Sequence, residues 1–408
     1  MYHADAQTGE LQYAISHGEG VVRDILAVDE ASGWVYFTAS GLERGRDRYF
    51  RHLYRARLDG GRQELLTPEN AEHLVTASPN KSFFVDSYGR LDTPLRTVVR
   101  GSEGRVLFVL EDSDAADLVE LRWRPPEPFT ASARDGVTEV HGALYYPTDF
   151  NPELRYPVVD MIYGGSQLTV TPKLFPLTTG SPLGSVPENQ LEDFWAPQAM
   201  AELGFLVIVI DGMGTPYRDR AFHEAALRGS GNAGGAADHI SAITELAAAR
   251  PYMDIDRVGI CGHSGGGENS LKALLRYPEF FKVAVSSAGS HDMRAYQAGA
   301  GLSDTGPGVT DFLTNTNAAL APRLEGKLLL VYGDMDENCH PLHTLRVVDA
   351  LIRANKDFDL LVLPNRNHGF TLDPYFIRRR WDYFVRHLRG EAPPADFDVA
   401  PGDVSAVL

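Results

Sequence analysis

From about residue 119 onward, short apolar segments alternate with longer segments of helical periodicity, and this alternation restricts the possible folds most. Apolar segments of this length are typical of buried strands, whereas the periodic segments between them are typical of helices that bury one face. Parallel strands need a long crossover connection, which is usually a helix, so the alternation indicates a parallel sheet covered on both faces. The sequence therefore predicts a doubly wound α/β domain.

The α/β part is predicted to contain seven strands, at residues 136–147, 156–165, 205–212, 257–263, 281–289, 327–336 and 358–365. Helices are expected between or after these strands, for example at 236–250, 267–278 and 374–388. We assign residues 119–395 to this domain and residues 396–408 to a C-terminal tail.

Residues 1–118 have a different pattern. Short runs rich in aromatic and β-branched residues lie between turn signals such as DGG, SPN and GSEG, which indicates antiparallel β-structure. A propeller blade takes roughly 40 to 50 residues, so this region would supply two or three blades, fewer than closure needs. Because an open set leaves unpaired strand edges, we expect this partial propeller to pack against something or to belong to a longer chain.

Composition and charge exclude several classes of protein. Apolar residues make up 43% of the chain and charged residues 23%, which is ordinary globular usage. The formal net charge of −17 makes nucleic acid a poor partner. The best apolar run, 205–210, is far shorter than the roughly 18 residues of a membrane span. The N-terminus lacks the features of a secretory signal, so we expect a cytoplasmic chain as given, with a periplasmic or secreted location open to a longer form.

The segment Gly262-His263-Ser264-Gly265-Gly266 ends one predicted strand and precedes a helical run. This is G-x-S-x-G in the setting that a nucleophilic serine requires, since larger side chains beside the turn would clash with the strand and helix backbones. The helix N-terminus would also place the N–H of Gly265 and the positive end of the helix dipole where an oxyanion forms. The pattern predicts Ser264 as a nucleophile.

In α/β-hydrolases an acid and then a histidine follow the nucleophile along the chain, each after a later strand. The strand predicted at 327–336 ends with three acids, Asp334, Asp336 and Glu337, and the next strand is followed by His368. His368 would accept the serine proton and later deliver it to the leaving group, while an acid holds its tautomer. Spacing alone does not tell which of the three acids has this role.

A second oxyanion donor is expected from the loop after the strand at 156–165, where the sequence is Tyr163-Gly164-Gly165-Ser166. Either the hydroxyl of Tyr163 or a glycine N–H could donate to the oxyanion. The pattern alone does not separate these two donors from a core tyrosine beside a turn.

Over residues 20–390 the chain resembles the prolyl oligopeptidase family of serine peptidases, in its dipeptidyl-peptidase IV branch. The resemblance implies an α/β-hydrolase domain beside a β-propeller, with residues 1–118 as the last blades. The family's Gly-x-x-Asp-x-Asn motif matches residues 333–338 and implies Asp336 as the triad acid, and its His-Gly matches His368 and the glycine after it. Its oxyanion tyrosine matches Tyr163, and Asn338 matches a residue that contacts the substrate carbonyl.

The chain also departs from that family. Members are much longer, most of the propeller is missing before residue 1, and the pair of glutamates that holds the substrate's α-amino group has no counterpart. Gly265 replaces an aromatic residue, and residues 297–308 replace an aromatic-rich stretch that supplies tyrosines to the proline pocket. We therefore expect weakened selectivity for the substrate N-terminus and for proline.

Weaker patterns lead to no functional prediction. Residues 229–234 match G-x-G-x-x-G, but no strand precedes them as dinucleotide binding requires. Cys339, His340 and His343 could suggest zinc, but they are expected to begin the helix after the acid loop. Cys261 is expected in the core, and the two cysteines leave one disulfide bridge open. We expect no metal and no cofactor.

The motifs and the resemblance together predict a serine hydrolase that forms an acyl-enzyme with a Ser264–His368–Asp336 triad, in which the resemblance selects Asp336 as the acid. The resemblance alone makes it a peptidase for short peptides, because the fold supports esterases equally well. Two alternatives stay open: an esterase or acyl-peptide hydrolase, and a truncated, catalytically idle chain whose β region is an interaction surface. The apolar and arginine-rich helix at 374–388, together with the resemblance, predicts a homodimer through the hydrolase domain.

Overall fold

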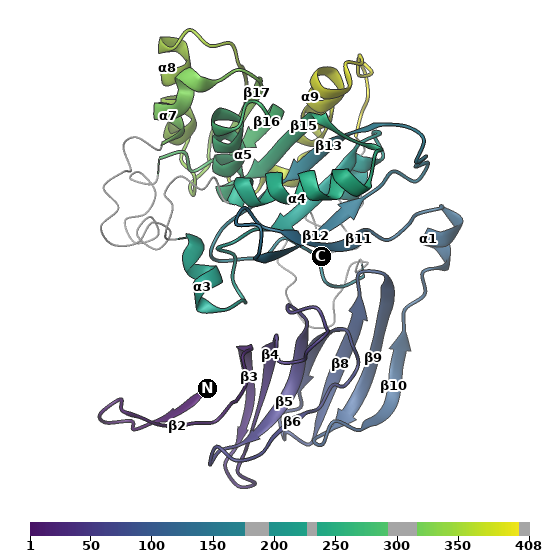
Figure 1. The fold of residues 1–408 in the computed structure, drawn as a ribbon, viewed down its shortest axis with the longest axis vertical. Coiled ribbons are helices and arrows are strands. Elements are labelled where there is room, and N and C mark those ends of the chain that lie inside the picture. Colours follow the sequence, from purple (N-terminus) through teal and green to yellow (C-terminus); the bar gives the residue numbers. More distant parts are fainter. Residues whose placement is uncertain (176–195, 227–234, 293–315, 400–408) are drawn as a thin grey trace. The chain divides into compact units, whose positions relative to one another are not determined.

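A computed structural model describes residues 1–175, 196–226, 235–292 and 316–399 (Figure 1). These residues form two compact units. The first contains residues 1–125 with the segments 172–175 and 217–220, and the second contains residues 126–171 and 196–216 together with the described residues after 220. The predicted boundary at residue 119 remains a prediction.

The first unit consists mainly of two four-stranded antiparallel sheets, each a simple meander. One contains β3 (Val21–Asp29), β4 (Trp34–Ser40), β5 (Arg51–Arg57) and β6 (Gln63–Leu65). The other contains β7 (Glu72–Ala77), β8 (Phe83–Arg90), β9 (Thr93–Gly101) and β10 (Val106–Asp112). A hairpin of β1 (Tyr2–Ala4) and β2 (Leu11–Ala14) precedes them, and α1 (Ala116–Glu120) follows.

Alternation along β4 explains how the two sheets pack. Val35 and Phe37 belong to an apolar cluster within the first sheet, whereas Tyr36 points the other way and shares a cluster with Leu53 and with Phe84 of β8. Because successive side chains of a strand point to opposite faces, one strand can line both clusters. The antiparallel β region that the sequence predicts is thereby confirmed.

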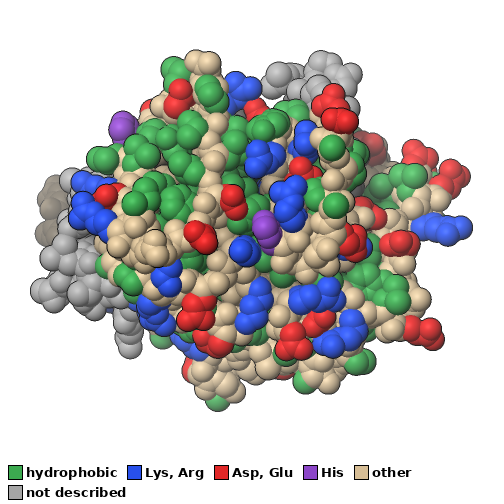
Figure 2. All heavy atoms as spheres, turned by 90° about the horizontal axis from the view of Figure 1, so that it is seen from above, with side chains coloured by type: hydrophobic (Ala, Val, Ile, Leu, Met, Phe, Trp, Pro, Cys, Tyr) green, Lys and Arg blue, Asp and Glu red, His purple; other side chains and the backbone are tan. Residues whose placement is uncertain are grey.

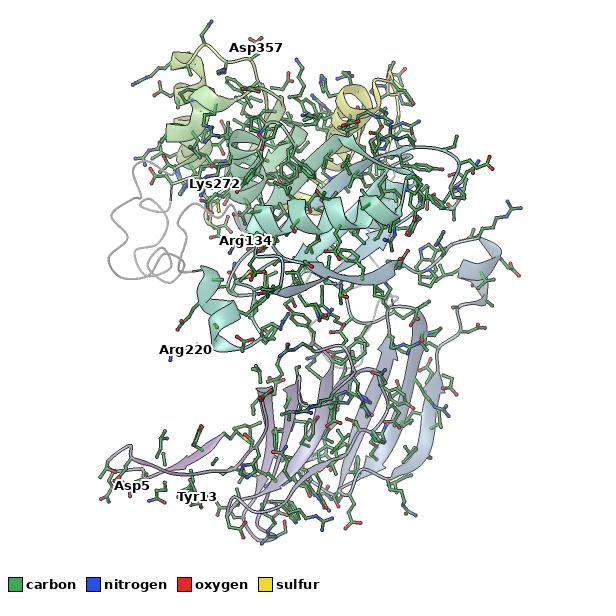
Figure 3. The ribbon with its side chains drawn as sticks, viewed as in Figure 1. Asp5, Tyr13, Arg134, Arg220, Lys272 and Asp357 are labelled. Atoms are coloured by element: carbon green, nitrogen blue, oxygen red, sulfur yellow. The ribbon has the colours of Figure 1, made fainter. Side chains whose placement is uncertain are left out.

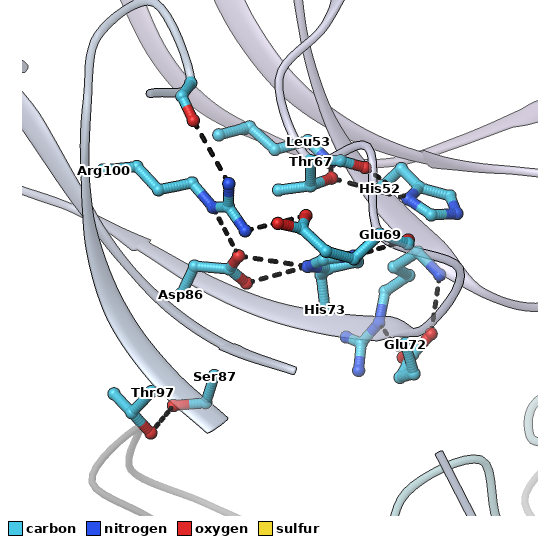
Figure 4. A network of polar contacts seen from close by, with 12 residues as sticks. His52, Leu53, Thr67, Glu69, Glu72, His73, Asp86, Ser87, Thr97 and Arg100 are labelled. Atoms are coloured by element: carbon cyan, nitrogen blue, oxygen red, sulfur yellow. Dashed lines mark hydrogen bonds and ion pairs between the residues drawn. The ribbon is translucent and has the colours of Figure 1, made fainter. Parts of the chain in front are cut away.

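A buried polar network also joins the two sheets (Figure 4). Arg100 is 1% exposed and donates to Asp86 at 2.7 Å and to Glu69 at 2.8 Å. His73 Nδ1 lies 3.0 Å from the same Asp86 carboxylate, and the His73 ring packs on His52 of the first sheet. Buried charges are tolerated when each is paired and hydrogen-bonded, and this condition is met here.

The second unit is built on an eight-stranded sheet in the order β11-β12-β14-β13-β15-β16-β17-β18. Its strands are β11 (Glu127–Ser132), β12 (Glu139–Tyr145), β13 (Tyr156–Met161), β14 (Leu206–Asp211), β15 (Met253–His263), β16 (Phe281–Ser287), β17 (Lys327–Gly333) and β18 (Asp359–Leu363). The first three strands in this order pair antiparallel and all other pairs are parallel. The sequence prediction missed β11, a short edge strand that contains Pro128; sheets accept proline mainly at edges, strand starts and bulges.

Helices cover both faces of this sheet, as a doubly wound domain requires. Alternate sheet residues such as Ile208 and Ile260 form one core with residues of α4 (Ala236–Ala249), α5 (Gly265–Arg276) and α8 (Leu342–Arg353). On the opposite face, a Cβ added to Gly259 would meet the ring of Phe384, which belongs to α9 (Pro374–Phe384). The predicted α/β-hydrolase fold is confirmed.

Short helices remain: α3 (Arg220–His223), whose first residue Arg220, labelled in Figure 3, is the last residue of the first unit's segment 217–220, and α7 (Asn317–Leu320) of the second unit. Within the described ranges, no helix combines the length and the apolar character needed to cross a bilayer. Figure 2 shows one face of the molecule, on which acidic and basic side chains are intermingled around apolar ones.

Candidate active site

Ser264 lies in a tight turn between β15 and α5, with φ 60° and ψ −122°. This conformation is rare for a residue that carries a side chain. The flanking glycines make the turn possible, because a Cβ on Gly262 would lie 2.4 Å from the carbonyl oxygen of Ile162 and one on Gly266 would lie 2.3 Å from the same atom. The local structure is therefore the tight strand-to-helix turn that the sequence predicts at Ser264.

Asp336 and His368 meet at the ends of two adjacent strands, β17 and β18. His368 Nδ1 lies 2.8 Å from Asp336 Oδ2, and the aspartate side chain is fully buried while the histidine side chain is 18% exposed. The other carboxylate oxygen of Asp336 accepts from the backbone N–H groups of Asn338 at 2.9 Å and Cys339 at 2.7 Å. The carboxylate is thus held by its own loop and presents one oxygen to the histidine.

The other two acids of this loop have different surroundings. Asp334 is exposed, and its Oδ1 accepts from the N–H of Asn365 at 2.6 Å. Glu337 is also exposed. Neither has a hydrogen bond to His368 among the contacts of the described residues, so the geometry distinguishes Asp336 from its neighbours.

Two contacts bring the serine turn to this acid–histidine pair. Ser264 Oγ lies 3.9 Å from Cys339 Sγ, in the loop that holds Asp336. His263, next to the serine, has its ring 4.8 Å from the ring of His368 and its Nε2 2.9 Å from the carbonyl oxygen of His368. Sequence reasoning assigned no function to His263 and treated Cys339 only as part of a doubtful metal cluster, because neither contact can be read from spacing.

Cys339 is buried, and burial, followed by the charge of Asp336, raises the pKa of its thiol to about 12. A thiol with such a pKa stays protonated and unreactive near neutral pH. Both cysteines are buried and neither is in a disulfide, so the single bridge that the sequence left open is not formed. The thiol next to Ser264 is therefore a neutral neighbour rather than a second nucleophile.

Tyr163 lies next to Gly265, the residue that follows Ser264. A Cβ on Gly265 would lie 3.6 Å from the Tyr163 hydroxyl, and Gln167 Nε2 lies 3.4 Å from the same hydroxyl. The N–H of Gly265 is at the first turn of α5, where backbone N–H groups lack helical partners. Two groups of the kind that can donate to an oxyanion are therefore close to each other.

Of the remaining predicted features, Asn338 lies in the described part of the chain and several segments do not. Asn338 is exposed beside Asp336 and uses its backbone N–H on that carboxylate. Residues 229–234, the predicted pocket segment 297–308 and most of the C-terminal tail lie outside the described residues.

Comparisons with known proteins agree with this geometry. A family model described as "Prolyl oligopeptidase family" matches residues 191–391, and one described as "Dipeptidyl peptidase IV (DPP IV) N-terminal region" matches residues 1–95. Dipeptidyl peptidase 8 of Mus musculus is 29% identical over 388 residues, which cover 90% of this chain and 40% of that protein. A probable dipeptidyl-aminopeptidase B of Emericella nidulans is 29% identical over 372 residues, covering 87% of this chain and 38% of that protein.

Solved structures give the same assignment. Porphyromonas gingivalis dipeptidyl peptidase 4 matches with a TM-score of 0.77 and 26% identity, over 95% of this chain and 52% of that one. A putative dipeptidyl aminopeptidase IV from Bacteroides ovatus matches with a TM-score of 0.78 and 25% identity, over 94% and 52%. The chain spans less than half the length of the curated relatives it matches. In sequence and in fold, the chain belongs to the prolyl oligopeptidase family, in its dipeptidyl-peptidase IV branch.

Proposed function

We propose that this chain is a serine peptidase that cleaves short peptides through an acyl-enzyme, with Ser264 as nucleophile, His368 as general base and Asp336 as the orienting acid. The observation that carries the proposal is the 2.8 Å contact between Asp336 and His368, beside a strained turn that carries Ser264. Family membership supports the same chemistry.

The mechanism follows from the hydrogen bonds. Asp336 can only accept from His368 Nδ1, so the proton of the neutral imidazole is on Nδ1 and Nε2 is free to take the Ser264 proton. The serine oxygen then bonds to the substrate carbonyl carbon, and the carbonyl oxygen becomes an oxyanion. The N–H of Gly265 and the hydroxyl of Tyr163 would stabilise that charge. His368 next protonates the leaving amine, and water, activated by the same base, releases the acid product. No cofactor enters any step.

Asn338, exposed beside the acid, would contact the substrate carbonyl as its family counterpart does. An esterase or acyl-peptide hydrolase is the alternative, because the triad itself does not select the bond that is cleaved. We propose that residues 1–118 are the last blades of a propeller and residues 119–395 the catalytic domain, with 396–408 as a tail.

A homodimer through the hydrolase domain stays a proposal that rests on the resemblance. The helix argument for it is weaker than the sequence indicated, because Phe376 and Phe384 are buried within their own unit and only Tyr375 of the aromatic residues there is largely exposed. The measured mass of the chain in solution tests this association.

Labelling with a fluorophosphonate tests the central proposal. Only a serine activated by a base and beside an oxyanion site reacts rapidly, so we expect one labelled residue, Ser264, and no labelling of Ser264→Ala. Labelling that persists in Ser264→Ala refutes the assignment. Hydrolysis of Xaa-Pro amides, acyl-peptides and short esters by the same preparation then separates a peptidase from the alternative hydrolases.

A further inference from the structure

His263 makes contacts with three parts of the site, although the proposed mechanism gives it no role. Its Nε2 lies 2.9 Å from the carbonyl oxygen of His368, and its Nδ1 lies 3.1 Å from Oγ of Ser287 at the end of β16. Its ring packs against the His368 ring and meets the ring of Phe370 edge-on, with centroids 5.0 Å apart and planes at 87°. One side chain therefore connects the serine turn to the loop that carries the histidine.

The hydrogen bond to His368 fixes the tautomer of His263. A carbonyl oxygen can only accept, so His263 Nε2 must carry a proton and donate it to His368. The Ser287 hydroxyl, whose oxygen lies 3.1 Å from Nδ1, donates its own proton to the carbonyl oxygen of Gly262 at 2.9 Å. Burial, and after it the neighbouring His368, lowers the pKa of His263 to about 3. The ring is therefore neutral near neutral pH. Neutrality matters because a positive ring at this place would oppose the imidazolium that His368 forms.

The histidine loop needs an anchor at residue 368. Residues 364–367 are exposed, and two hydrogen bonds tie this part to the β17 loop, from the N–H of Asn365 to Asp334 at 2.6 Å and from the N–H of Met335 to the carbonyl of Arg366 at 3.1 Å. The tie at His368 itself comes from His263. The imidazole of His368 has one hydrogen bond among the contacts of the described residues, from Nδ1 to Asp336, so its position depends on where the backbone of residue 368 is held.

We infer that His263 is a positioning residue, whose Nε2–H holds the backbone of His368 so that the imidazole stays aligned between Asp336 and Ser264. The inference rests on the proposed function, because it concerns the same triad. It adds a residue of the G-x-S-x-G segment that acts on the base rather than on the nucleophile. A shift of about 1 Å in a catalytic group is enough to cost much of the rate, so one backbone hydrogen bond can matter.

Two amide substitutions separate this role from simple packing. The amide nitrogen of glutamine occupies nearly the position of imidazole Nε2, whereas that of asparagine corresponds to Nδ1. His263→Gln can therefore still donate to the His368 carbonyl, and His263→Asn cannot reach it. The two variants bury similar polar groups, so each is the matched control for the other. His263→Phe, a third variant, keeps a ring for packing against Phe370 and lacks the donor.

The experiment compares kcat and KM for the Xaa-Pro amide or ester that the wild type hydrolyses, fluorophosphonate labelling rates, and melting temperatures. We expect kcat and labelling rate to fall about tenfold in His263→Asn and His263→Phe, the size of one lost hydrogen bond, and to stay within about threefold of the wild type in His263→Gln. KM should be similar in all four proteins.

The outcomes separate the two proposals. Labelling that does not depend on Ser264 refutes the proposed function, and this inference with it. When labelling does depend on Ser264, equal rates for His263→Gln and His263→Asn overturn this inference alone. An increase in KM without a fall in kcat also overturns this inference. So does a fall in kcat that parallels the fall in melting temperature across the three variants, because lost packing alone would produce that result.

Discussion

Replacing Asp336 with asparagine is the change whose effect on the site can be worked out most completely. The carboxylate accepts three N–H groups: one oxygen takes those of Asn338 and Cys339, and the other takes His368 Nδ1–H. An asparagine must keep its oxygen toward the two backbone N–H groups, because its NH₂ group cannot accept from them. The NH₂ group therefore faces His368.

This orientation reverses the histidine tautomer. An NH₂ group at 336 donates to His368 Nδ1, which must then give up its proton and leave it on Nε2, and a protonated Nε2 cannot accept from Ser264. We expect kcat to fall by on the order of 10⁴, as for the same change in serine proteases. Since each tenfold corresponds to about 1.36 kcal/mol, this is about 5 kcal/mol of lost transition-state stabilisation.

The control is Asp334→Asn, two residues away. The Oδ1 of Asp334 accepts one N–H, from Asn365, and an asparagine oxygen can replace it without any change at His368. We expect less than about a tenfold loss in kcat, because a weakened hydrogen bond in a neighbouring loop is worth only about 1 kcal/mol. The assay is kcat on the substrate found for the wild type, with circular dichroism to show that both variants fold. A larger loss for Asp334→Asn than for Asp336→Asn would refute the assignment of the acid.

Three further results are expected. Tyr163→Phe should lower kcat by about 10² to 10³ with little change in KM, as for loss of one oxyanion donor, and an unchanged kcat would leave that role to a backbone N–H. The chain should prefer an Xaa-Pro amide with a free N-terminus over its N-acylated form by less than about tenfold in kcat/KM. A preference above about a hundredfold would reveal an acidic group that binds the substrate's amino group. The candidates for that group are Glu188, Glu192 and Asp193, which lie outside the described residues. For the buried pair His239–Asp160, burial lowers the pKa of His239, but the charge and hydrogen bond of Asp160, with the charges of Asp238 and Asp211, raise it above 6.5 overall. The contribution of this pair to stability should therefore be complete below pH 6.5 and be lost as the pH rises through the raised pKa of His239. The difference in melting temperature between wild type and His239→Gln should be larger at pH 6 than at pH 9. A difference that grows with pH would contradict the raised pKa.

The parts of the site that could be predicted are those formed by residues close together in the sequence. Gly262 and Gly266 flank Ser264 because of close backbone contacts, and such contacts leave a readable pattern. The choice of Asp336 over Asp334 needed the family motif, since both follow the same strand. The contact between His263 and the His368 carbonyl had no signal, because it joins segments 105 residues apart through one side chain and one backbone atom.

The fold shows the same division. Continuous apolar runs located the central strands, which are buried on both faces, but β11 was missed because this short edge strand buries only alternate residues and contains a proline, so it has no apolar run. The aromatic residues of α9 were interpreted as surface for a partner. Phe384 instead fills the space above Gly259, which has no side chain of its own. Periodicity identifies the apolar side of a helix and does not show what covers it.

The backbone of Ser264 bears on whether such a chain could persist without catalytic use. Its φ of 60° costs a serine an energy on the order of 1 to 3 kcal/mol that a glycine would not incur. In an idle protein, Ser264→Gly would therefore be a stabilising mutation, and drift would meet no penalty in accepting it. Serine at this position is stable in evolutionary terms only while its hydroxyl is needed, which weighs against the idle interaction chain left open by the sequence.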